Sequence, residues 1–105
     1  MTDRDVGQTL LDLANWFQQH DIIPFVLQIP PRTRCRDMHR DLYRNQSTKA
    51  NRQTNDRMRS GRYIGLPMSM LVDCLIDGVH FSAVGYEIIA SAIRDRLHAL
   101  HTLLH

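Results

Sequence analysis

Hydrophobic residues near the start of the chain follow a helical spacing. They recur at steps of three and four residues, at Val6, Leu10, Leu13, Ala14 and Phe17. This spacing predicts an amphipathic helix with one apolar face. Thr2 followed by Asp5 resembles a capping box at the start of this helix, and His20 with Asp21 predicts its end.

The next hydrophobic run has the character of a buried strand. Ile22 to Ile29 is nearly all apolar and rich in β-branched residues, which is typical of a parallel strand covered on both faces. Pro24 fits only near the beginning of such a strand, and Pro30 with Pro31 predicts its end. A helix followed by such a strand is half of a β-α-β unit, so we expect its partner strands to lie N-terminal to Met1.

The rest of the chain predicts two helices and one short strand. Residues 32–62 have the composition of a polar linker and a helix that contains Asn51. The segment from Arg62 to Ser69 predicts a strand whose length is limited by Gly65 and Pro67. From Ser82 onward, an apolar stripe predicts a last helix that packs against the sheet along most of its length. The stripe consists of Ile89, Ile93, Leu97, Leu100 and Leu104.

The composition is that of a small globular domain. Of the 105 residues, 43% are hydrophobic and 23% are charged, which argues against wholesale disorder. The sequence has no run of eighteen apolar residues, and the first 20 residues carry Asp3, Asp5 and Asp12 where a signal peptide would be apolar. The default expectation is therefore a cytoplasmic setting. Cys35 and Cys74 lack the spacing of a zinc site, so a disulfide or, the favoured alternative, two free thiols remain.

Positive charge is concentrated in the middle of the chain. From Arg32 to Arg62 there are nine Arg and one Lys against three Asp, a local formal charge of +7, and the flanks compensate with −5. Such a segment is compatible with a non-catalytic module that binds nucleic acid or an acidic partner. A solvated arginine-rich surface is the favoured alternative, because no aromatic platform or RNA-binding fingerprint accompanies the charge.

The strongest candidate for chemistry is the segment Asp77-Gly78-Val79-His80. A carboxylate three residues before an imidazole, across a glycine-containing turn, can accept the Nδ1 proton and leave Nε2 free as a general base. Ser82 is placed to cap the helix that follows, and Gly85 allows another backbone to approach its first turn. An isolated D-x-x-H is a weak signal, because Asp-Gly turns are common and a His after one is usually solvated.

The ten residues from Asp77 to Tyr86, D-G-V-H-F-S-A-V-G-Y, resemble the last block of the SGNH (GDSL-type) hydrolases. That block reads roughly D-G-hydrophobic-H-hydrophobic-[SN]-x-x-G-[YH]. The order of predicted elements, with a strand ending in Pro-Pro-Arg at residues 30–32, also resembles the C-terminal half of that family. The resemblance implies an α/β fold of the three-layer α/β/α type, present in residues 1–105 as a partial domain with a short parallel sheet.

The same resemblance implies a serine esterase in which Asp77 and His80 are the catalytic acid and base of the triad. Its substrate would be a small acyl ester, and no cofactor or metal is implied. The arginines beside the site would bias substrate choice toward anions.

Other parts of the family's catalytic site are absent from the sequence. The family's nucleophile lies in a G-D-S-[LY] block and its oxyanion donors in two middle blocks, none of which is present. No serine follows Gly-Asp, and Ser82 is too near His80 along the chain to serve it across a site; the serines are Ser47, Ser60, Ser69, Ser82 and Ser91. We therefore expect no esterase activity without an N-terminal half, and we expect self-association of an incomplete domain.

Three histidines near the C-terminus suggest one more site. His98, His101 and His105 share a helical face at spacings of three and four, which suits a divalent metal. Their favourable interaction with the helix dipole is the preferred explanation, because no carboxylate or Cys completes a ligand set.

Overall fold

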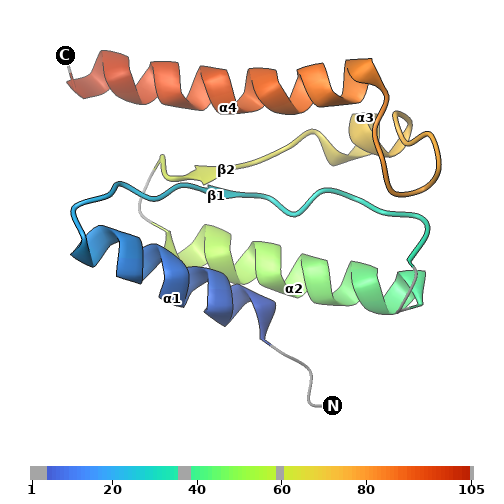
Figure 1. Cartoon of the computed structure of the whole chain (residues 1–105), viewed down its shortest axis with the longest axis horizontal. Helices are drawn as coiled ribbons and strands as arrows, with labels where there is room; N and C mark the ends of the chain where they lie inside the picture. The colour runs from blue at the N-terminus through green and yellow to red at the C-terminus, as the bar shows by residue number, and fades with distance from the viewer. Residues whose placement is uncertain (1–4, 36–38, 59–60, 105) are drawn as a thin grey trace.

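The computed structural model describes residues 5–35, 39–58 and 61–104. Within these ranges the chain forms a mixed α/β fold with four helices and a small parallel sheet of two strands (Figure 1). The elements in chain order are α1 (Val6–Gln19), β1 (Val26–Leu27), α2 (Arg40–Arg57), β2 (Tyr63–Ile64), α3 (Met68–Val72) and α4 (Ala83–Leu104).

The two strands lie between helices on either side. In Figure 1, α1 and α2 cover one side of the strands and α4 covers the other. The strands pair in parallel, with Val26 opposite Tyr63 and Leu27 opposite Ile64. The Val26 N–H donates to the Arg62 carbonyl at 2.9 Å and the Gln28 N–H donates to the Ile64 carbonyl at 2.8 Å. Both strands therefore point their carboxyl ends toward α3 and the turn that follows it.

Helix α1 begins one residue after its cap. The Asp5 carboxylate accepts a hydrogen bond from the Gln8 N–H at 3.0 Å, so Asp5 itself is the N-cap. This corrects the predicted capping box, in which Thr2 was the cap; Thr2 lies outside the described residues. Helix α1 packs closely on α2 at Gly7. A Cβ added to Gly7 would lie only 3.2 Å from the Ala50 Cα.

The first strand is shorter than the sequence predicts. The prediction of a strand over residues 22–29 is wrong in extent, because only Val26 and Leu27 of this run belong to the sheet. Ile22 and Ile23 are 50% and 60% exposed, and the Ile22 N–H donates to the Phe17 carbonyl, so this stretch still caps α1. The partner strand ends before Gly65, which leaves little backbone for β1 to pair with. The predicted strand within residues 62–69 is confirmed as β2.

The core lies beneath the turn before α4. Leu66, Leu71 and Phe81 form its buried cluster, and Ile88, Ile89 and Ala92 pack on it from α4. Helix α3, which carries Leu71, was not predicted. Of the predicted apolar stripe, Ile89, Ile93 and Leu100 are partly buried, whereas Leu97 is 45% exposed. A Cβ on Gly61 would lie 3.1 Å from Leu100 Cδ2, so the second half of α4 also approaches the rest of the chain.

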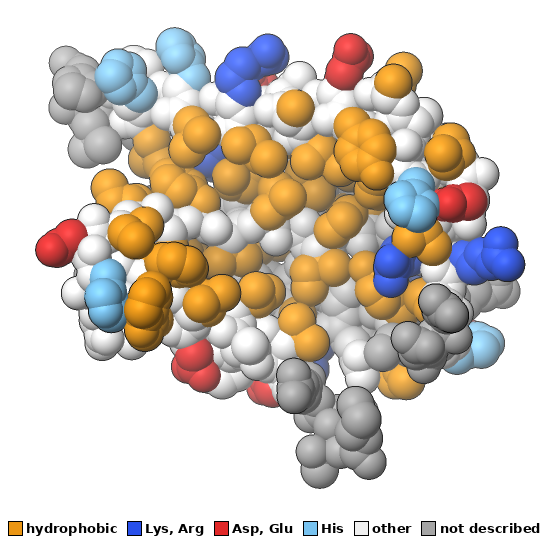
Figure 2. All heavy atoms as spheres, in the orientation of Figure 1, with side chains coloured by type: hydrophobic (Ala, Val, Ile, Leu, Met, Phe, Trp, Pro, Cys, Tyr) orange, Lys and Arg blue, Asp and Glu red, His pale blue; other side chains and the backbone are white. Residues whose placement is uncertain are grey.

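Many hydrophobic side chains stay accessible. Figure 2 shows them gathered in a band between α4 and α1, over the strands. Across the described residues, the large hydrophobic side chains with the largest exposed fractions are Ile76, Ile23, Val84, Met70, Trp16, Tyr86, Leu13 and Ile22.

Candidate active site

The turn from Asp77 to His80 is organised around one carboxylate. Asp77 Oδ1 accepts hydrogen bonds from the Val79 N–H at 2.9 Å and from the His80 N–H at 2.6 Å. Its second oxygen, Oδ2, lies 2.7 Å from His80 Nδ1. A single side chain thus fixes both the backbone of the turn and the imidazole ring.

The contact between Asp77 and His80 determines which ring nitrogen is available. A carboxylate accepts and does not donate, so the proton of this bond lies on Nδ1 and Nε2 is left as the basic nitrogen. Hydrogen bonds from the His80 N–H, the His80 ring and the Val79 N–H hold the pKa of Asp77 well below its usual range. The His80 side chain is 65% exposed. The hydrogen bond that the D-x-x-H spacing predicts is therefore present, and the basic nitrogen belongs to an accessible ring.

Gly78 joins this turn to the segment that follows β1. Its φ is +84°, a conformation that glycine adopts readily and other residues rarely do. Its carbonyl accepts hydrogen bonds from the N–H groups of Thr33 and Arg34, at 2.9 and 3.1 Å. Because these residues follow one strand and the turn follows the other, the site lies beyond the carboxyl ends of both strands (Figure 1).

The residues after His80 anchor the turn to α4. The Ser82 Oγ accepts a hydrogen bond from the Gly85 N–H at 3.3 Å, which confirms the predicted helix cap. A Cβ on Gly85 would lie 2.8 Å from the Phe81 Cβ and 2.9 Å from the Cys74 Cβ. The atoms that approach Gly85 closely belong to side chains, whereas the prediction was the approach of another backbone.

A hollow of about 540 Å³ opens beside the turn. It is lined by Arg34, Cys35, Asp77 and Val79. The sequence resemblance predicts that arginines of this segment lie beside the site, and Arg34 does lie beside Asp77; Cys35 was not singled out by the sequence. Their position follows from the hydrogen bonds between Thr33, Arg34 and Gly78, which no local pattern encodes.

None of the described serines hydrogen-bonds to His80. Ser82 caps α4, Ser47 Oγ donates to the Arg44 carbonyl, and Ser91 Oγ lies 3.5 Å from an Arg94 nitrogen. Ser69 is exposed on α3, and Ser60 lies outside the described residues. Within residues 5–35, 39–58 and 61–104, the site thus contains an acid and a base and no serine nucleophile.

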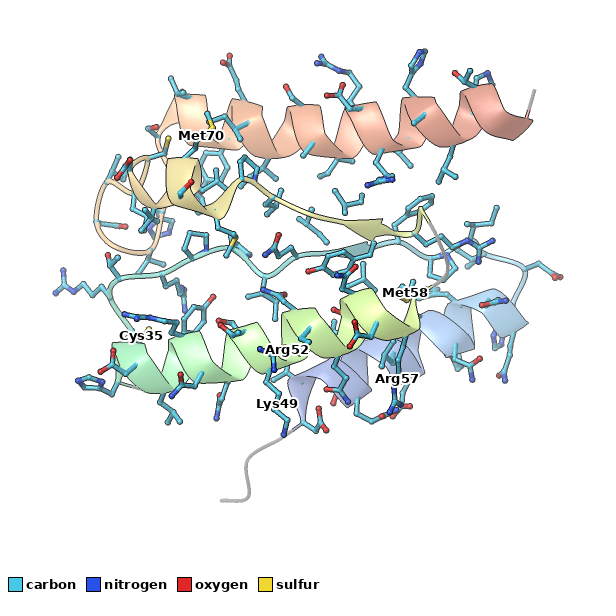
Figure 3. All side chains as sticks on the ribbon, turned by 180° about the vertical axis from the view of Figure 1, so that it is seen from behind. Cys35, Lys49, Arg52, Arg57, Met58 and Met70 are labelled. Atoms are coloured by element: carbon cyan, nitrogen blue, oxygen red, sulfur yellow. The ribbon has the colours of Figure 1, made fainter. Side chains whose placement is uncertain are left out.

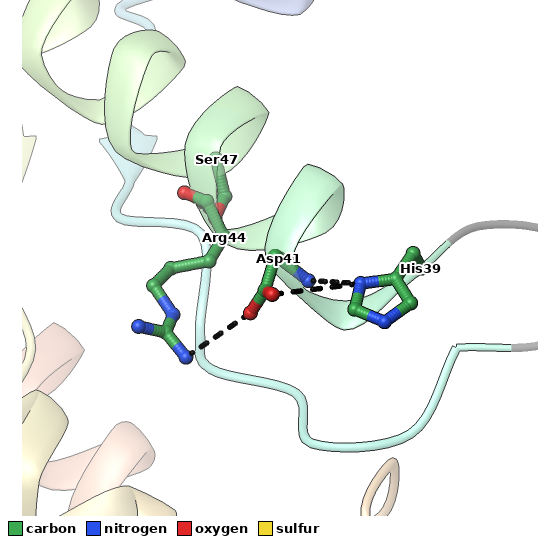
Figure 4. A network of polar contacts seen from close by, with 4 residues as sticks. All are labelled: His39, Asp41, Arg44 and Ser47. Atoms are coloured by element: carbon green, nitrogen blue, oxygen red, sulfur yellow. Dashed lines mark hydrogen bonds and ion pairs between the residues drawn. The ribbon is translucent and has the colours of Figure 1, made fainter.

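The described basic side chains of the arginine-rich segment lie in several different places. Arg32 lies over the Tyr43 ring, with 5.8 Å between the guanidinium carbon and the ring centroid. Arg44 forms an ion pair with Asp41 at 3.6 Å (Figure 4). Figure 3 shows Lys49, Arg52 and Arg57 along α2, and all three are exposed.

His39 contacts Asp41 at the start of α2 but forms no ion pair with it. Its Nδ1 accepts from the Asp41 N–H at 3.2 Å (Figure 4), so that nitrogen carries no proton for an ion pair with the nearby carboxylate.

Comparison with known proteins does not extend the sequence resemblance. No family model, curated protein or solved structure matches the chain. Among the described residues, no helix is both long and apolar enough to cross a membrane. The same residues contain no group of three or more metal-ligating side chains, and His105 of the predicted histidine face lies outside them.

Proposed function

We propose that this chain carries the Asp-His part of an SGNH-type serine esterase site, in a fold that corresponds to the C-terminal half of that three-layer architecture. His80 is the general base and Asp77 is the residue that orients it. The nucleophilic serine and the oxyanion donors come from polypeptide outside the described residues. The substrate class is a small acyl ester.

The observation that carries this proposal is the 2.7 Å contact between Asp77 Oδ2 and His80 Nδ1. Asp77 cannot rotate away without losing two backbone hydrogen bonds, so the carboxylate is held in position before any substrate arrives. A His oriented in this way has its Nε2 ready to take a proton from a hydroxyl group. The position beyond the carboxyl ends of two parallel strands supports the same role.

In the complete reaction, Nε2 of His80 removes the serine proton as the serine oxygen attacks the ester carbonyl. The resulting imidazolium is stabilised by the Asp77 carboxylate and then gives its proton to the departing alcohol. Water hydrolyses the acyl-serine by the same proton transfers, which releases the acid. Arg34, in the hollow beside Asp77, favours esters that carry a negative charge.

A direct test uses p-nitrophenyl acetate and the chain alone. The wild-type protein should release nitrophenol without saturation, and only slightly faster than His80→Ala, because a base without a nucleophile and oxyanion donors contributes little. His98→Ala, which alters an exposed histidine on α4, is the matched control. Saturable turnover that disappears in His80→Ala and in one serine variant would show that the chain already contains a nucleophile.

A second test supplies the missing groups. The chain is fused behind a polypeptide that carries the Gly-Asp-Ser and oxyanion blocks of an SGNH hydrolase. Saturable turnover should appear and should fall about 10²- to 10⁴-fold in His80→Ala, the usual contribution of a general base. A fusion that turns over ester equally well with and without His80 would refute the proposal. Independently of the fusion, ¹⁵N NMR of the chain alone should find the His80 proton on Nδ1 at pH 8.

A further inference from the structure

The outer edge of β1 has backbone groups without partners. In an extended strand, alternate residues point their N–H and C=O groups to opposite edges. Val26 and Gln28 point theirs toward β2, as their hydrogen bonds to Arg62 and Ile64 show. Phe25 and Leu27 therefore point theirs away from β2. Within the described part of the chain, these four groups have no hydrogen-bond partner.

Asn51 bonds the backbone groups of Ile29, the next residue along this edge toward the carboxyl end. Its side-chain oxygen accepts from the Ile29 N–H at 2.7 Å, and its side-chain nitrogen donates to the Ile29 carbonyl at 3.2 Å. Asn51 is 9% exposed, so the amide is held firmly in this role. An added strand can pair with Phe25 and Leu27 but cannot extend its pairing to Ile29.

An apolar hollow of about 270 Å³ adjoins the same edge. It lies between α1 and β1 and is lined by Leu10, Leu13, Ala14, Phe17 and residues 24–27. Leu13 is 50% exposed at its rim. Hydrophobic side chains around unpaired strand backbone are the usual composition of a surface that accepts another strand.

The accessible surface is too large for a compact monomer. It measures 7809 Å², whereas a folded chain of this mass is expected to expose about 6,100 Å². The excess is about 1,700 Å², and a standard interface removes only about 800 Å² from each partner. One interface of ordinary size can therefore be accommodated within this excess.

We propose that the β1 edge is an interface between two copies of this chain, which pair their β1 strands antiparallel about a twofold axis at Val26. In this register Phe25 of one copy lies opposite Leu27 of the other, and each such pair exchanges two hydrogen bonds. All four unpaired groups of each edge are then satisfied. The result is a continuous sheet of four strands, with both copies of α1 on the same face.

This register is favoured over the neighbouring ones. With a twofold axis at Leu27, the two Leu27 residues would exchange two hydrogen bonds. Phe25 would then lie opposite Ile29 of the other copy, whose N–H and carbonyl groups are already bonded to Asn51. The free edge of β2 is a poorer surface, because Gly65 has no side chain to bury and Pro67 has no N–H to donate. The interface does not involve the turn at Asp77, which lies beyond the carboxyl end of the strand, but it uses the strand for which the sequence predicts partner strands from an N-terminal half.

Sedimentation and light scattering over a range of concentrations test the interface. The wild-type chain should form a dimer. Leu13→Lys, which places a charge at the rim of the apolar hollow, should weaken dimerisation at least tenfold. Val84→Lys is the matched control, because Val84 is 60% exposed at the start of α4, and it should leave the dimer unchanged. A monomer at every concentration, or larger assemblies that Leu13→Lys does not affect, would overturn the inference.

Cross-linking tests the register directly. In a background with Cys35→Ser and Cys74→Ser, Val26→Cys should form a disulfide-linked dimer when oxidised glutathione is added. In the proposed register the Val26 residues form a non-hydrogen-bonded pair, with Cα atoms about 4.5 Å apart. Leu27→Cys, at the adjacent position, should cross-link slowly. Faster cross-linking through Leu27→Cys would contradict the twofold axis at Val26, and cross-linking through neither residue would contradict the antiparallel pairing.

Discussion

At the scale of single residues, the site depends on one carboxylate that does three things at once. Asp77 accepts the N–H groups of Val79 and His80 through one oxygen and the His80 ring through the other. This use of both oxygens couples the shape of the turn to the tautomer of the histidine. Removing the charge of Asp77 should therefore change the protonation of the ring and the stability of the turn together.

The charge of Asp77 should make the turn sensitive to acid. Its pKa is lowered by the hydrogen bonds from His80 and Val79, so the ionised form stabilises the folded state. This contribution is fully present above the unfolded pKa of about 4 and is lost as the pH falls through the lowered pKa. Thermal unfolding should show Asp77→Asn melting below wild type at pH 7, with the difference shrinking toward pH 2. A difference that stays constant over this range would contradict the assignment.

At the scale of elements, the sequence predicted those whose signals are local. The apolar spacing of α1, the cap at Ser82 and the D-x-x-H contact each depend on residues a few positions apart, and all three are present. The extent of β1 depends on how much backbone β2 provides for pairing, and the residues from Ile22 to Ile29 do not indicate this. The same reason explains why the sequence does not indicate the contact of Thr33 and Arg34 with Gly78, which spans more than forty residues.

The link between the β1 segment and the D-x-x-H turn can be tested at Gly78. In Gly78→Ala the new Cβ would lie 2.6 Å from the Arg34 Cβ and 2.9 Å from the Thr33 Oγ1, in a backbone with φ of +84°. We expect a loss of about 1–3 kcal/mol in the free energy of unfolding, measured by urea denaturation.

Gly65 provides the matched control for this substitution. A Cβ there would meet only the Gln28 Oε1, at 3.8 Å, so Gly65→Ala should unfold close to wild type. If both substitutions cost the same, steric conflict at the turn is not what makes Gly78 necessary.

At the scale of the whole molecule, the fold is thin and its core is small. The radius of gyration is 14.9 Å and the extents are 43 × 35 × 19 Å, whereas a compact domain of about 100 residues has a radius of gyration near 13 Å. Leu71 is the one apolar side chain among the described residues that is fully buried. The stability of the chain and the position of the turn therefore depend on the same few contacts around Leu71.

Leu71→Ala should be the most damaging truncation of an apolar side chain. Leu71 is 0% exposed and packs with Leu66 and Phe81, the residue that follows His80. A cavity at this place should cost about 2–5 kcal/mol, a large fraction of the 5–15 kcal/mol that stabilises a typical domain. Ile76→Ala is the control, because Ile76 is 69% exposed and its truncation should cost less than about 0.5 kcal/mol. Urea denaturation followed by circular dichroism measures both, and equal losses would mean that the cluster beneath the turn is not the core that holds the molecule together.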